Sequence, residues 1–175
     1  MKEQEKLDEA KYFYQRMLAE QYNPLHFKYK LSAFLSASRS VLQYVFKEVK
    51  VKPKGLIWYQ KAVKNSPVIK FCRDKRNSNI HYSPVDPDIK FTLQLDDCLI
   101  PSTADHLTLN GQPQAERPPS QVAVREKELK PPAPPPEYKF DKWLGLDDVP
   151  TLCRKYLSEL EQFIKKGKSL GYISG

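Results

Sequence analysis

The chain has 175 residues, of which 40% are hydrophobic and 29% charged. These values suit one folded domain spanning 1–175 with a core of moderate size, and no apolar run is long enough to cross a membrane. The net charge of +8, with an isoelectric point near 9.3, attracts polyanions such as RNA but is equally compatible with solubility alone.

The three cysteines, Cys72, Cys98 and Cys153, are far apart and lack the CxxC or Cys/His spacing of a zinc site. They are expected to be reduced thiols, and no metal or other cofactor is expected. The first ten residues, MKEQEKLDEA, have no apolar segment of the kind found in signal peptides. These features predict a cytoplasmic protein without a membrane contact.

Two long helices are predicted first, over residues 4–21 and 24–50, with Asn23-Pro24 as the break between them. Each has one apolar face at helical spacing. On the second helix, serines surround Arg39 on another face, where small side chains allow a neighbouring helix or a second copy to approach closely. Arg39 is therefore either a structural cation at that contact or a ligand for a phosphate.

A shorter helix is predicted over 54–65, with Trp58 as a core anchor rather than a base-stacking platform. Ser66 then caps a helix that begins at Pro67. On this helix Arg76 lies in the same stripe as the apolar side chains of Ile69, Cys72 and Ile80. Because an arginine keeps its charge, a position facing the protein requires an anion or several acceptors.

The polar run Asn77–Asn79 favours bending or ending the helix, and such a bend would bring His81 beside Arg76. A cation, an amide and an imidazole at one point suit a phosphodiester. The alternative is an ordinary helix end, with Arg76 in a salt bridge and His81 capping carbonyl groups.

The six residues RNSNIH, Arg76–His81, resemble the Arg-x4–6-His motif of the HEPN superfamily (higher eukaryotes and prokaryotes nucleotide-binding domains). Asn77 fits the polar residue typical directly after the arginine, and AFLSASRSVLQYV, 33–45, resembles the second long helix of such domains. The resemblance covers roughly residues 5–82 and 147–167. It implies a metal-independent endoribonuclease that forms a homodimer, with two copies of the motif in one cleft.

After the motif the pattern changes to alternation, with Ile89, Phe91, Leu93 and Leu95 on one face of a predicted strand. Residues 106–110 and 121–125 are weaker strand candidates, and Asn110-Gly111 is a turn signal. The sequence thus predicts a small antiparallel sheet within 88–128.

Residues 130–136, KPPAPPP, are expected to form extended polyproline II, as a stiff spacer or as a ligand for a partner. Tyr138, Phe140 and Trp143 would then dock the returning chain. Asp147-Asp148 begin a last amphipathic helix that ends at Lys165–Gly167, and the tail beyond is expected to be loose.

The predicted fold is mainly α, an antiparallel bundle of four to five helices with a small antiparallel β insertion and a proline-rich return segment. The helical core would comprise about 4–82 and 147–167, with the insertion at about 84–146.

The predicted function is cleavage of RNA by attack of a ribose 2′-hydroxyl, which leaves a 2′,3′-cyclic phosphate. His81 would transfer the proton, Arg76 would hold the phosphate and Asn77 would orient either one. The predicted partners are RNA, a second copy with the site at the interface, and an antitoxin protein if the chain serves a toxin–antitoxin or defence system. The alternative is a non-catalytic helical dimer that binds RNA or a partner protein. The candidate substrate-binding cations are Arg39, Arg73 and Lys75.

Overall fold

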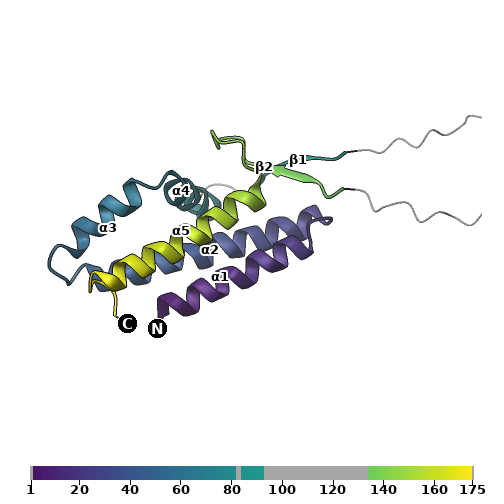
Figure 1. Cartoon of the computed structure of the whole chain (residues 1–175). Helices are drawn as coiled ribbons and strands as arrows, with labels where there is room; N and C mark the ends of the chain where they lie inside the picture. Colours follow the sequence, from purple (N-terminus) through teal and green to yellow (C-terminus); the bar gives the residue numbers. More distant parts are fainter. Residues whose placement is uncertain (1, 82–83, 93–133, 175) are drawn as a thin grey trace, which may run out of the picture. The chain divides into compact units, whose positions relative to one another are not determined.

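The computed structural model describes residues 2–81, 84–92 and 134–174, with the side chains of 80 and 81 excepted. The fold is mainly helical with a two-stranded antiparallel sheet, as predicted (Figure 1). One compact unit comprises Met1–Phe91 and Pro135–Gly175. Its elements are α1 Lys2–Ala19, α2 Pro24–Val49, α3 Gly55–Lys64, α4 Pro67–His81, β1 Asp88–Lys90, β2 Glu137–Lys139 and α5 Val149–Ser169.

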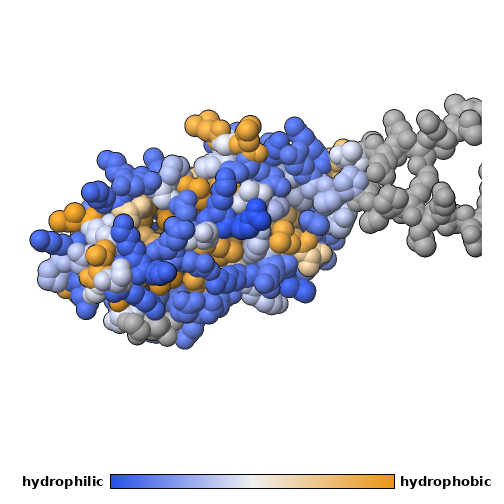
Figure 2. Space-filling model, in the orientation of Figure 1, coloured by the Kyte–Doolittle hydropathy of each residue, from blue (hydrophilic) through white to orange (hydrophobic). Residues whose placement is uncertain are grey.

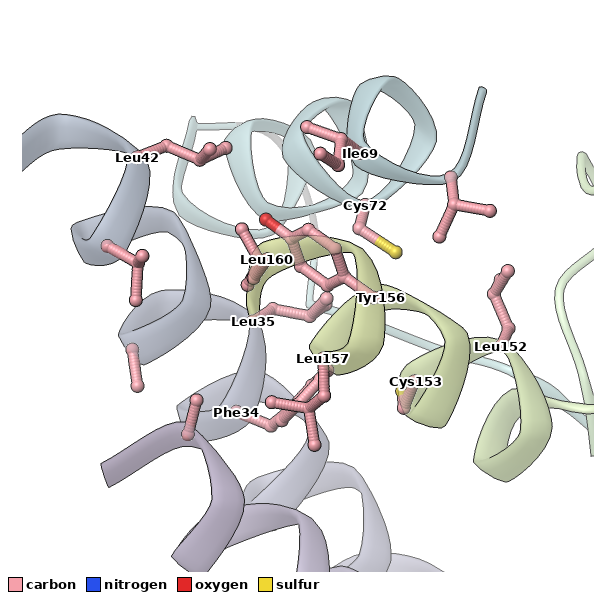
Figure 3. Close-up of a cluster of buried hydrophobic side chains, with 14 of the residues drawn as sticks. Phe34, Leu35, Leu42, Ile69, Cys72, Leu152, Cys153, Tyr156, Leu157 and Leu160 are labelled. Carbon is pink, nitrogen blue, oxygen red and sulfur yellow. The ribbon is translucent and has the colours of Figure 1, made fainter. Parts of the chain in front are cut away.

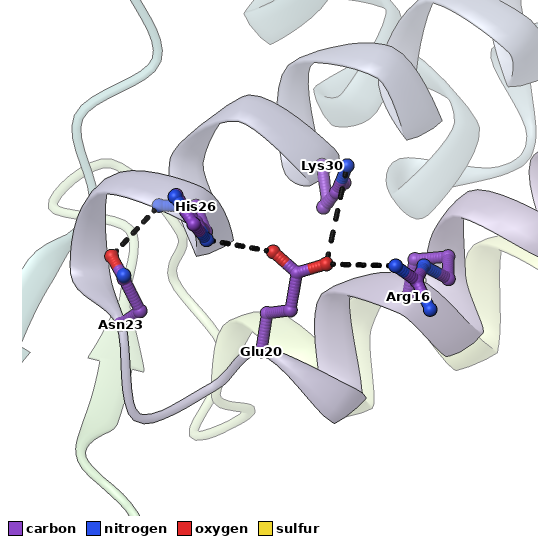
Figure 4. A network of polar contacts seen from close by, with 5 residues as sticks. All are labelled: Arg16, Glu20, Asn23, His26 and Lys30. Atoms are coloured by element: carbon purple, nitrogen blue, oxygen red, sulfur yellow. Dashed lines mark hydrogen bonds and ion pairs between the residues drawn. The ribbon is translucent and has the colours of Figure 1, made fainter.

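The turn between α1 and α2 is built on polar contacts (Figure 4). The Asn23 side chain caps α2 by accepting from the backbone N–H of His26 at 3.1 Å, and Pro24 occupies the first turn, where no N–H is needed. Glu20 lies within 3.1 Å of His26 Nδ1 and 3.4 Å of Arg16 Nη2. The predicted break at Asn23-Pro24 is therefore confirmed.

The core lies between α1, α2, α4 and α5, and Figure 3 shows the apolar stripes of α2, α4 and α5 facing one another. Tyr156 of α5 is fully buried and meets Phe34 of α2 edge to face, with ring centroids 6.1 Å apart. Cys72 places its side chain against the same cluster from α4. Close packing of these three helices fixes the positions of the polar residues on α4. No helix in the described part of the chain is long and apolar enough to span a bilayer.

The end of the chain is packed, and the prediction of a loose tail after Gly167 is wrong. The last helix continues to Ser169, and Gly171, at a φ of +71°, reverses the chain. Ile173 is then 3% exposed, and the Tyr172 ring lies 5.4 Å from that of Trp58. A glycine was needed at 171 because that φ is strained for other residues.

Trp58 is a core anchor, as predicted, because its indole stacks on Phe163 of α5 with centroids 4.9 Å apart. Phe163 also meets the ring of Tyr59 at 5.7 Å. These contacts hold α3 against α5, and the Tyr172 ring completes the cluster.

The strand that precedes the insertion, β1, pairs with the strand that follows it, β2. The sequence did not predict this pairing. Ile89 of β1 lies opposite Tyr138 of β2. Tyr138 is 1% exposed, stacks on Phe27 with ring centroids 3.6 Å apart, and donates its hydroxyl to the Gln21 carbonyl at 2.6 Å. Residues 84–91 and 135–146 thus belong to the bundle rather than to the insertion. The strand candidates 106–110 and 121–125, and most of KPPAPPP, lie outside the described residues.

Candidate functional site

Helix α4 runs without a break from Pro67 to His81, so the predicted bend at Asn77–Asn79 is wrong. The beginning of the helix is as predicted, since Ser66 Oγ accepts from the Ile69 N–H at 2.9 Å and also contacts Glu159 of α5. Capped and held at this end, the helix continues through its polar residues. The physical reason for this continuity lies in the tertiary contacts of Asn79.

Asn79 joins α4 to two other parts of the fold. Its Nδ2 donates to Ser32 Oγ of α2 at 2.7 Å, and its Oδ1 accepts from the Val85 N–H at 2.9 Å. Both hydrogen-bonding groups of the Asn79 amide have partners, one on α2 and one in the segment after α4. The amide therefore does not compete for the backbone hydrogen bonds of its own helix. Val85, 7% exposed, is held in the core by this contact.

Replacing Asn79 by alanine is expected to lower the free energy of unfolding by about 1–3 kcal/mol, because two partly buried hydrogen bonds are lost. Asn77→Ala is the matched control, because no hydrogen bond ties its side chain to another described residue; it should cost no more than about 0.5 kcal/mol. Urea unfolding followed by circular dichroism measures both variants. Equal losses from the two would contradict the bridging role of Asn79.

Arg76 is half-buried on α4, in keeping with its place in the apolar stripe. Its Nε atom is buried without a hydrogen-bond partner, and no carboxylate within the described ranges pairs with it. The alternative of an ordinary salt bridge thus finds no partner in that part of the chain. A half-buried guanidinium that has no anionic partner favours the binding of an anion, because the anion compensates its charge.

His81 is the last residue of α4, and its side chain lies outside the described residues. In a continuous helix, positions 76 and 81 are separated by about 140° around the axis. Position 77, one turn before 81, shares its side of the helix. The structure therefore places Asn77 near the position of His81, whereas Arg76 faces another direction.

Two candidate substrate-binding cations on α4 already have carboxylate contacts. Arg73 binds Asp74 Oδ1 through Nε and Nη2, each at 3.1 Å. Lys75 pairs with Asp141 at 2.9 Å and lies 5.0 Å from the Phe140 ring centroid. The hydrogen bond from Lys75 lowers the pKa of Asp141. Lys75 thus ties the returning chain to α4.

Arg39, the third candidate cation, is half-buried on α2, and its Nε is buried without a partner in the described part of the chain. Burial raises the pKa of the Tyr59 phenol, while the charge of Arg39 and its hydrogen bond to Tyr59 oppose that rise, as does the charge of Arg73. Arg39, Tyr59 and Arg73, from three different helices, are therefore close neighbours.

The described cysteines offer neither a metal site nor a nucleophile. Cys72 and Cys153 are free and buried, and burial raises the pKa of both thiols, which keeps them protonated. No group of three or more His, Cys, Asp or Glu residues within the described ranges is arranged to hold a metal ion.

A basic surface that no sequence motif indicated extends from the turn before α3, over α3, to the beginning of α4. From Val49 to Arg73 the sequence has seven basic residues and no acidic one, a signal that a simple count of charges reveals. The lysines among them are exposed, and none forms an ion pair with another residue that the structure describes. We call them the α3 lysines: Lys50, Lys52 and Lys54 in the turn before α3, Lys61 and Lys64 on α3, and Lys70 on α4.

Several lysines elsewhere on the bundle have carboxylate partners. Lys11 pairs with Glu161 at 2.6 Å, and Lys155 pairs with Asp147 at 2.7 Å. Lys47, Lys165 and Lys166 are exposed and have no ion pair among the described residues, so what distinguishes residues 49–73 is the complete absence of acidic side chains in a stretch with seven basic ones. Figure 2 shows hydrophilic and hydrophobic residues side by side over the end of the bundle where α3 lies.

Three depressions border α4, and the two that are lined by the candidate cations Lys75 and Arg73 lie on different sides of the helix. The larger, about 490 Å³, lies along Phe71, Lys75 and Asn79 and is closed by Val85 and Asp141. The smaller, about 290 Å³, lies between α3 and α4, and its lining comprises Tyr59, Gln60, Val63, Lys64, Lys70 and Arg73. Neither is lined by Arg76 or Asn77. Three basic residues and no acidic ones line the smaller depression.

Comparisons of this chain with protein-family models, with curated proteins and with solved structures find no match.

Proposed function

We propose that this protein binds RNA through the basic surface of α3 and the beginning of α4. The observation that carries the proposal is the uncompensated charge of the α3 lysines, which have no carboxylate partner in the described part of the chain. Such lysines bind phosphates without first breaking an ion pair, and each contact releases a counterion from the nucleic acid. RNA is favoured over DNA by the resemblance of Arg76–His81 to the HEPN motif.

The distribution of charge along the chain supports the same proposal. Residues 93–133 contain more acidic than basic side chains, so the net charge of +8 arises in the helical unit. A field concentrated on one unit steers a polyanion toward it. The free, buried thiols fit the reducing cytoplasm, where we place the protein together with its RNA.

The expected result is that Lys50→Gln/Lys52→Gln/Lys61→Gln weakens binding of a labelled single-stranded oligouridine by at least about tenfold. The control, Lys11→Gln/Lys28→Gln/Lys155→Gln, removes the same charge from lysines that have carboxylate partners and should change affinity less than about twofold. Fluorescence anisotropy at several salt concentrations measures both. The slope of log K against log salt should become shallower by about 2 in the first variant alone.

Equal weakening by the two triple variants would contradict a defined basic surface. Equal affinity for the matching DNA oligonucleotide would overturn RNA as the specific ligand. The surface would then bind polyanions in general. The circular dichroism spectrum and melting temperature of each variant show whether the bundle remains folded.

We propose as a second candidate that the bound RNA is cleaved without a metal ion. The observation that favours it is the position of Asn77 one turn before His81 on a continuous α4, where an amide can orient an imidazole. His81 would take the proton from a ribose 2′-hydroxyl or give one to the leaving 5′-oxygen. Cleavage of RNA in EDTA, leaving 2′,3′-cyclic phosphate ends, is the expected result. Intact RNA after prolonged incubation with a folded protein would overturn it.

A homodimer belongs to this second candidate, because one imidazole does not readily serve as acid and base in a single step. Arg76 and position 81 face different directions on one helix, so a second copy would supply the arginine that acts on the same phosphate. An antitoxin protein that covers the site would be a further partner.

A further inference from the structure

The depression between α3 and α4 has a lining suited to an anion. Lys64 comes from the end of α3, whereas Lys70 and Arg73 come from the first two turns of α4. Tyr59 and Gln60 add a hydroxyl and an amide to the same wall. Three cations and two uncharged hydrogen-bonding groups surround a space of about 290 Å³.

The cations that surround the depression remain available to a ligand. Lys64 and Lys70 are exposed and have no ion pair among the described residues. The Asp74 contact of Arg73 uses Nε and Nη2, which leaves the N–H groups of Nη1 without a partner in the described part of the chain. Asp74 itself does not line this depression. A guanidinium with free N–H groups beside two ammonium groups matches the oxygen atoms of a phosphate.

Arg39 adds a fourth positive charge next to Tyr59, one of the residues that line the depression. It does not line the depression, but it interacts with Tyr59, which does. Its Nε is buried and has no hydrogen-bond partner in the described part of the chain. Because a guanidinium can only donate, the hydrogen bond from Arg39 to Tyr59 leaves the phenol O–H available to donate to an anion.

We propose that this depression is a phosphate-binding site, in which Arg73, Lys70 and Lys64 hold one phosphate group of the bound RNA and Tyr59 supports it. The inference rests on the proposed RNA binding and names where on the basic surface the principal contact lies. The shared chemistry, a phosphate group between three cations, admits either a diester of the backbone or a terminal monophosphate.

The test compares two double variants that remove equal charge. Lys70→Gln/Arg73→Gln alters the depression, and Lys50→Gln/Lys52→Gln alters the same basic surface outside it. Anisotropy with labelled oligouridine should show a loss of at least about twentyfold for the first and about fivefold or less for the second. Tyr59→Phe, which keeps the ring, should weaken binding by about two- to fivefold. Melting temperatures verify folding.

The source of the phosphate is distinguished with two RNAs, one with a 5′-phosphate and one with a 5′-hydroxyl. A preference for the 5′-phosphate that disappears in Lys70→Gln/Arg73→Gln would assign a terminal monophosphate. Equal affinity for the two RNAs, with the large loss retained in that variant, would assign a backbone diester.

Three further results separate failure of this inference from failure of the proposed function. Equal losses from the two double variants, with RNA still bound by the wild type, would overturn the site alone. Absence of RNA binding by the wild type would overturn the proposed function. Calorimetry with pyrophosphate then tests the depression independently: binding lost in Lys70→Gln/Arg73→Gln supports it, and absence of binding overturns it.

Discussion

His81→Ala and Arg76→Ala are each expected to reduce RNA cleavage by at least about 100-fold, and a mixture of the two is expected to recover activity. The reason is geometric. Positions 76 and 81 lie about 140° apart on a continuous α4, so the two side chains reach one phosphodiester most directly when different copies supply them. A mixed dimer then contains one intact site, formed by the arginine of one variant and the histidine of the other.

With random exchange of subunits, half of the dimers are mixed and each has one intact site of two, so activity should recover to about a quarter of the wild type. The measurement is the rate of release of cyclic phosphate ends in EDTA, before and after mixing. A site formed within one chain gives no recovery, and this outcome would overturn the shared site. Light scattering on the wild type is the control, because a monomer at assay concentration contradicts the dimer.

Tyr138→Ala is expected to lower the free energy of unfolding by about 3–5 kcal/mol, the largest loss from any single change considered. The ring is 1% exposed and stacks on Phe27, and the hydroxyl donates to the Gln21 carbonyl in the turn after α1. Truncation leaves a cavity beside Phe27 and an unpaired carbonyl. Chemical unfolding, followed by fluorescence of the two tryptophans, measures the loss.

Tyr138→Phe separates the two contributions, since it keeps the stacked ring and removes only the hydroxyl; its expected cost is about 1 kcal/mol. Lys139→Ala, on the same strand with its side chain largely outside the core, should change stability by less than about 0.5 kcal/mol. If Tyr138→Ala were no more costly than Lys139→Ala, the returning strand would not be part of the folded unit.

Local patterns in the sequence predicted the helices well because their signals act over a few residues. Asn23 and Ser66 cap α2 and α4, and each is followed by a proline at a position that needs no N–H. The apolar stripe of α5 likewise predicted the buried face that carries Tyr156. The candidate residues Arg39, Arg73, Lys75 and Arg76 all lie on these helices.

The uncompensated basic surface illustrates a signal that is present in the sequence but is interpretable only with the fold. The absence of acidic residues from Val49 to Arg73 is visible in the sequence. Whether those lysines have partners depends on side chains far away, as the pairing of Lys11 with Glu161 shows. Ion pairs between distant segments are not encoded in local spacing.

The sequence by itself determined the mainly α class, the helix beginnings and the apolar faces, because capping and periodicity are local properties of the chain. Only the tertiary structure decided that α4 continues to His81, that β1 pairs with β2, and that Ile173 is buried. Each of these depends on a contact across the sequence: Ser32 with Asn79, Phe27 with Tyr138, and Trp58 with Tyr172. Such contacts satisfy polar groups and bury rings in ways that override the local preference of Asn79 to bend a helix or of the last residues to remain loose.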